Sequence, residues 1–177
     1  MKINLPMIGV GDNVIAQFTY AQGATLYIGS GINVATALTN SGGTTKALAY
    51  GEDAVVDATG GLHKTSGWSV TGGFEHHWNP AWKTSLFGAY GQLNYDATAS
   101  AVLVTATGAG SAGSANWNYT QIGSRTVWTP VANLDLSVEV MYNSLNTGFG
   151  GSGTAATGFG NLNWVSGIFR AQRNFYP

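Results

Sequence analysis

Glu75, His76 and His77 are adjacent, and they form the densest group of acid, base and metal-binding side chains in the sequence. Metal or acid–base chemistry needs such groups to converge on one point, but neighbouring residues of a strand point to opposite faces. The third histidine, His63, falls in a predicted loop. The pattern therefore favours His76 at an interface and His77 on a polar face, and it predicts no metal site.

The glycine-rich stretch Gly108 to Gly113 matches the spacing of a dinucleotide-binding fingerprint. That fingerprint requires a helix after the glycines, whereas residues 114–119 have the pattern of a strand. No GxSxG nucleophile motif is present. The sequence therefore predicts no catalytic residues and no cofactor. An enzyme whose active site is carried by a membrane β-barrel is an alternative.

The composition is unusual for a soluble domain of 177 residues. Only 8% of the residues are charged and 12% are aromatic, and there are 26 glycines, whereas about 25% of residues are charged in ordinary soluble domains. The net charge of −1 gives no basic surface for nucleic acid. There is no cysteine for a disulfide scaffold, and no apolar run is as long as a membrane helix requires.

The stretch from Leu134 to Tyr142 alternates strictly between apolar and polar side chains. Leu136, Val138 and Val140 share one parity, while Asp135 and Glu139 share the other. A period of two places these sets on opposite faces of a strand. In a soluble sandwich the polar face would meet water, whereas in a membrane barrel the apolar face meets lipid and the polar face meets the lumen.

Seven strands are predicted, with connections that alternate in length. The strands cover residues 2–8, 14–28, 68–78, 82–95, 116–129, 134–142 and 162–176. Residues 82–95 have a mixed pattern that indicates a bulge. Long loops are expected at residues 29–66, with a weak strand or helix around Ala47 to Val56, and at residues 97–115 and 147–160. Short turns at one end and long loops at the other are typical of an all-β, antiparallel, up-and-down transmembrane barrel. We expect residues 1–177 to form a single, partial barrel domain.

Two groups of residues are predicted to have roles in such a barrel. Charged residues on the polar faces are expected to line the pore: Glu75, Lys83, Arg125, Asp135, Glu139 and Arg170. Aromatic residues near the strand ends are expected to form the interfacial girdles: Trp68, Trp78, Trp82, Trp117, Trp128, Trp164 and Phe175.

Several motifs together resemble the C-terminal part of alphaproteobacterial outer-membrane porins of the rhizobial type. They are residues 2–8 with Gly11 and Asp12, Glu75-His76 with residues 78–82 and 84–86, residues 123–126 with Trp128, residues 140–142, and the terminal segment 170–177. The resemblance implies a sixteen-stranded barrel, a homotrimer, and passive diffusion of small hydrophilic solutes and ions. It also places Arg125 and Arg170 on the inner wall.

These observations predict an outer-membrane porin segment that contacts lipid and binds no nucleic acid. The start, Met1 to Pro6, lacks the apolar core of a signal peptide, and we expect the chain to be part of a longer frame. The alternative is a soluble or surface-exposed β-rich binding or structural protein.

Overall fold

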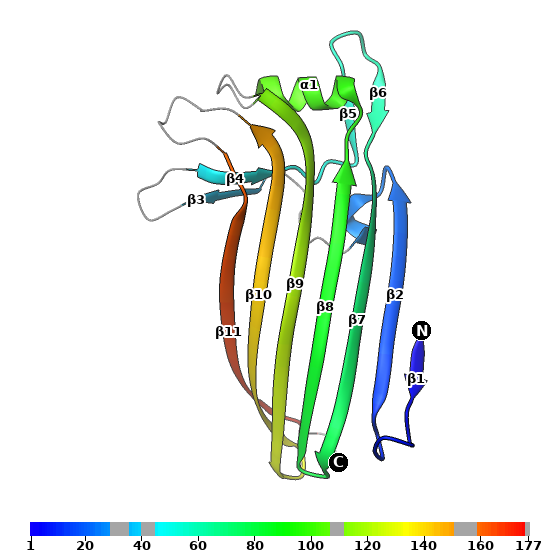
Figure 1. Ribbon diagram of the computed structural model, residues 1–177, viewed down its shortest axis with the longest axis vertical. Helices are drawn as coiled ribbons and strands as arrows, with labels where there is room; N and C mark the ends of the chain where they lie inside the picture. The colour runs from blue at the N-terminus through cyan, green and yellow to red at the C-terminus, as the bar shows by residue number, and fades with distance from the viewer. Residues whose placement is uncertain (29–35, 40–44, 107–111, 151–158, 176–177) are drawn as a thin grey trace.

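The computed structural model describes residues 1–28, 36–39, 45–106, 112–150 and 159–175. Its main feature is a seven-stranded antiparallel sheet (Figure 1). In spatial order the strands are β1 (Lys2–Asn4), β2 (Asn13–Gln22), β7 (Ser66–Asn79), β8 (Trp82–Asn94), β9 (Ala112–Val131), β10 (Leu134–Gly150) and β11 (Leu162–Arg173). Consecutive strands of the sheet pair with each other, and β1 and β11 form its two open edges. The predicted all-β, up-and-down fold is confirmed.

The connections alternate in length as predicted. Residues 80–81 join β7 to β8 and residues 132–133 join β9 to β10, so short turns lie at one end of the sheet. The long connections follow β2, β8 and β10 and lie at the opposite end (Figure 1). We call these the turn end and the loop end.

The two faces of the sheet differ in exposure. The outer face is defined by Val138, Val140 and Tyr142, whose side chains are all exposed. The inner face is defined by their strand neighbours Glu139 and Asn143. Toward the loop end the inner face is covered by the connection that follows β2, so that the core cluster lies there rather than between two sheets.

The long connections contain more regular structure than the sequence predicts. Residues 29–66, expected as one loop, include β3 (Thr36–Thr39), β4 (Thr45–Ala49), β5 (Ala54–Val56) and β6 (Leu62–Lys64), which pair as two short hairpins. Residues 97–115 include α1 (Ala97–Ala106) and the beginning of β9. Asp96 caps α1 by accepting a hydrogen bond from the amide of Ala99 at 2.8 Å. No helix in the described part of the chain is long and apolar enough to cross a membrane.

Three predicted strands end earlier than expected. β1 ends at Asn4 rather than Ile8. β2 ends at Gln22, because Gly23 has a φ of +69°, and Thr25–Ile28 forms a 3-10 helix, η1. β11 ends at Arg173, so Phe175 lies beyond the last strand, while Tyr176 lies outside the described residues.

No bulge explains the mixed pattern of residues 82–95. β8 pairs with β9 in unbroken register from Trp82 to Leu93, and its pairing with β7 shifts only between His77 and Asn79, opposite the start of β8. Phe87 and Leu93 lie on the inner face, where Leu93 is fully buried under the loop-end connection and Phe87 lies over Gly123. Part of the inner face is itself a packed core, and this explains why apolar side chains occur on both faces of β8.

Candidate functional site on the inner face of the sheet

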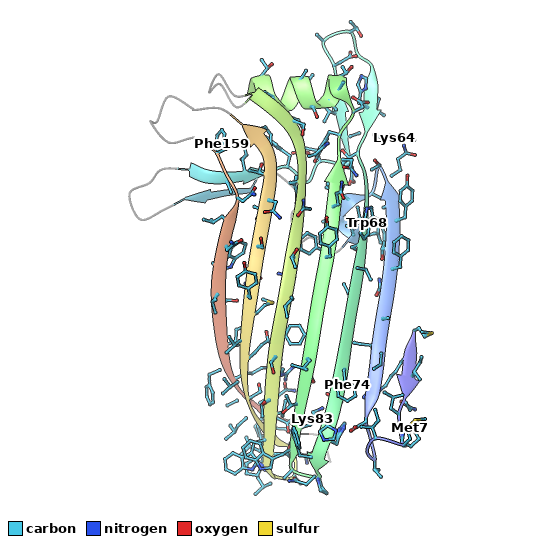
Figure 2. The ribbon with its side chains drawn as sticks, viewed as in Figure 1. Met7, Lys64, Trp68, Phe74, Lys83 and Phe159 are labelled. Atoms are coloured by element: carbon cyan, nitrogen blue, oxygen red, sulfur yellow. The ribbon has the colours of Figure 1, made fainter. Side chains whose placement is uncertain are left out.

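The charged residues predicted to line a pore share the inner face. Glu75, Ser85, Arg125 and Glu139 are successive cross-strand partners on β7, β8, β9 and β10 and so form one row across the sheet. Directly paired residues of an antiparallel sheet project from the same face. Lys83 (Figure 2) and Arg170 lie in the next row toward the turn end. Asp135 lies one further row along.

Some of these charged side chains form ion pairs or hydrogen bonds, and others form neither. The Lys83 Nζ lies 3.2 Å from Oε2 of Glu75, and the Ser85 hydroxyl donates a hydrogen bond to the same oxygen at 3.2 Å. Asp135 accepts a hydrogen bond from the Thr129 hydroxyl at 2.5 Å.

By contrast, Arg125, Glu139 and Arg170 form no ion pair or side-chain hydrogen bond with any other described residue. Arg125 and Glu139 nevertheless face each other across β9 and β10. The inner face therefore presents a free guanidinium beside a free carboxylate.

At the loop end, the segment Ala47 to Tyr50 packs against the inner face. Ala47 and Ala49 are fully buried. The carbonyl oxygen of Tyr50 accepts hydrogen bonds from the Tyr95 hydroxyl at 2.5 Å and from the Trp117 indole nitrogen at 2.6 Å.

Two further hydrogen bonds hold the same connection. The Thr147 hydroxyl donates to the carbonyl oxygen of Leu48 at 2.7 Å, and the Tyr119 hydroxyl donates to that of Ile28 at 3.3 Å. The connection after β2 thus fills the inner face at this level. Sequence reasoning missed this arrangement, because the contacts join residues up to 99 positions apart.

A buried carboxylate ties the first turn to β7. Asp12 is 1% exposed, and its two oxygens accept from the His77 amide at 2.8 Å and contact Nδ1 of His76 at 2.6 Å. The hydrogen bond from the His77 amide is the main cause that holds the pKa of Asp12 below its ordinary value.

Gly11 allows this close approach, because its φ is +95° and an added Cβ would lie 3.0 Å from the His77 ring. The ring of His76 and the backbone amide of His77 therefore bind the same carboxylate, although the two side chains lie on opposite faces of β7. The sequence pattern did not predict this contact.

A second cluster lies among the loop-end connections. His63 on β6 contacts Asp96 through Nδ1 at 2.7 Å and Asp57 through Nε2 at 3.1 Å. The hydrogen bonds to Asp57 and then to Asp96 raise the pKa of His63. Because Asp96 also caps α1, this bridge links the β5–β6 hairpin to the helix.

The aromatic residues of the predicted girdles divide into two groups. Trp82 and Trp128 stack on the outer face at the turn end with ring centroids 5.5 Å apart. Trp78, near the end of β7 and just before the turn that leads to Trp82, is 65% exposed. Trp68 lies toward the loop end (Figure 2), where its ring contacts Phe18 and Tyr90.

Trp117 and Trp164 differ from the prediction, because the register places both on the inner face. Trp117 pairs with Leu93 and is 2% exposed beneath Tyr50, and Trp164 pairs with Asn143. Their parity within β9 and β11 matches that of Arg125 and Arg170 respectively. This parity is a stronger signal than their position near the strand ends. Phe175 is 87% exposed.

The described residues contain no cluster of three or more His, Asp or Glu side chains that could hold a metal ion. Residues 108–111 of the glycine-rich stretch lie outside the described residues. The residues that follow belong to β9, so a strand occupies the place where a nucleotide-binding helix would begin.

Comparison with protein families gives a match over nearly the whole chain: the model of a porin subfamily matches residues 1–168. The chain belongs to the porin family. Comparison with curated proteins and with solved structures finds no significant match. Membership of the porin family supports an outer-membrane location and the passage of solutes, and it favours a channel over an enzyme. In this porin chain, the inner face of the sheet is the candidate surface for solutes.

Proposed function

We propose that this chain forms part of the wall of a water-filled channel through which small hydrophilic solutes and ions diffuse passively across the outer membrane. The observation that carries the proposal is the division of the sheet into a charged inner face and an apolar outer face. The outer face meets lipid, and Glu75, Lys83, Arg125, Asp135, Glu139 and Arg170 line the pore. No catalytic step is part of this function.

The wall requires more strands than these seven. A sheet that is open in a bilayer leaves unpaired backbone amides along β1 and β11, and each unsatisfied group costs several kcal/mol in lipid. Barrels of about eight strands have an interior filled by side chains, whereas porins of about 16 to 18 strands leave an aqueous channel. We propose that further strands close the barrel. We also propose that the complete porin is a homotrimer, and the support for this is the resemblance to trimeric porins.

The proposal is tested by reconstituting the native outer-membrane protein in planar bilayers and measuring conductance and reversal potential in a salt gradient. Stable conductance steps are expected. Glu139→Gln should shift the reversal potential toward anion preference, because it removes a wall carboxylate.

Lys64→Gln, which neutralises a charge on β6 outside the inner-face rows, should leave the reversal potential near that of the wild type. The absence of conductance steps, or equal shifts in both variants, would refute the proposal.

A further inference from the structure

A hollow of about 480 Å³ lies on the inner face, within the size range of small-molecule sites. Its lining includes Lys2, Ile15, Glu75, Phe87, Arg125 and Glu139. All six belong to the inner-face rows defined by the strand register. The hollow is therefore part of the surface that the proposed channel exposes to solutes.

The charged side chains that line the hollow have a net charge of zero, but two of them form no ion pair. Lys2 and Arg125 are cationic, and Glu75 and Glu139 are anionic. Glu75 is already engaged by Lys83 and Ser85. Arg125 and Glu139, which face each other on adjacent strands, form no ion pair with any described residue.

This arrangement distinguishes between classes of solute. A simple anion or cation gains one contact but meets a like charge about one strand spacing, roughly 5 Å, away. A solute that carries both charges meets each with its opposite. The apolar side chains of Ile15 and Phe87 in the same hollow offer contact to a short hydrocarbon group.

We propose that the hollow is a binding subsite for small zwitterions of the α-amino-acid class. The carboxylate of the solute binds the guanidinium of Arg125, which can donate two parallel hydrogen bonds, and the ammonium group binds the carboxylate of Glu139. Because the site is open and hydrated, binding is weak, and weak binding is what a permeating solute requires in order to leave again. The inference rests on the proposed channel function.

The test measures block of ion current through the reconstituted native protein by L-alanine at about pH 6.5, where the amino acid carries both charges. Lactamide, a neutral molecule of similar size, is the control solute. We expect L-alanine to reduce the current at a concentration at least about threefold below that of lactamide, because only alanine engages both charges.

Two single variants and one swap connect the block to the residues. Arg125→Gln and Glu139→Gln should each remove the difference between alanine and lactamide. The double variant Arg125→Glu with Glu139→Arg should restore it, because a zwitterion can bind in the reverse orientation. Lys64→Gln, which removes a positive charge from β6 outside the hollow (Figure 2), should keep the wild-type difference.

The outcomes separate the inference from the proposed function. Conductance without preferential block by alanine in the wild-type protein would overturn the subsite and leave the channel intact, whereas no conductance would refute the channel itself. Preferential block that persists in either assembled single variant would also overturn the assignment. If the single variants fail to assemble, the comparison of alanine with lactamide in the wild-type protein and in the swap variant still tests the subsite.

Discussion

The ring of Phe87 on β8 lies directly over Gly123, its cross-strand partner on β9. A Cβ added at Gly123 would be 2.6 Å from Cε2 and Cζ of the ring and 3.1 Å from the carbonyl oxygen of Val140. The absence of a side chain at Gly123 therefore makes room for an aromatic side chain on the inner face.

Gly123→Ala is expected to destabilise the folded sheet by about 1 to 3 kcal/mol, the usual cost of overpacking. The added methyl group must displace either the Phe87 ring or the backbone of β10. Urea unfolding of the native protein in detergent or lipid would measure the change. Gly72→Ala is the matched control, because the nearest atom to its added Cβ is 3.6 Å away. Equal destabilisation by both substitutions would contradict the packing of Phe87 over Gly123.

Val140→Arg is expected to impair assembly, because Val140 is 52% exposed on the apolar outer face. An arginine on the lipid face costs about 2 to 4 kcal/mol at the bilayer midplane. Glu139→Arg, one residue away on the inner face, should still assemble, because repulsion from its cross-strand partner Arg125 costs only about 0.2 to 1 kcal/mol. It should also alter ion preference. Heat-modifiable migration on gels compares the two, and loss of the folded band in both variants would show that the assigned faces are wrong.

The bridge from Asp57 through His63 to Asp96 is expected to weaken above neutral pH. The pKa of His63 is raised from 6.5, so its contribution is fully present below that value and is lost as the pH rises through the higher, folded-state pKa. The pKa values of Asp57 and Asp96 are lowered from 3.8. Their contributions are present above that value and are lost only as the pH falls through the lower, folded-state values. The bridge is therefore strongest between about pH 4 and 6.5.

Hydrogen exchange of residues 57–63 should accordingly be slower, after correction for intrinsic rates, at pH 5.5 than at pH 8.5. His63→Gln should remove this difference, since glutamine carries no titrating charge. A pH dependence that survives in His63→Gln would assign it to another group.

Trp117→Phe is expected to loosen the segment Ala47 to Tyr50. The substitution removes the hydrogen bond from the indole nitrogen to the Tyr50 carbonyl oxygen, while the Tyr95 hydroxyl still donates to that oxygen. The loss should exceed about 0.5 to 1.5 kcal/mol, the net contribution of one hydrogen bond, because the smaller ring also leaves a cavity at this buried position. Faster hydrogen exchange confined to this segment would show the effect. Trp128→Phe, on the outer face at the turn end, serves as the control and should leave that exchange unchanged.

The sequence by itself determined the sheet and its two faces. Alternation with a period of two is a local property, so the pattern of Leu134 to Tyr142 was enough to separate Val138 from Glu139. The same parity places Arg125 and Glu75 in one row once the strands pair. The alternation of short turns and long connections then predicted the order of the strands.

Only the tertiary structure decided which segment fills the inner face and which partners bind charged residues such as Asp12. Ala47 and Ala49 are buried because Trp117 and Tyr95, far along the chain, bind the Tyr50 carbonyl oxygen, and no local pattern encodes such a contact. Asp12 reaches His76 across 64 residues for the same reason. Periodicity specifies the side of a strand on which a residue lies, whereas burial and pairing depend on segments that only folding brings together.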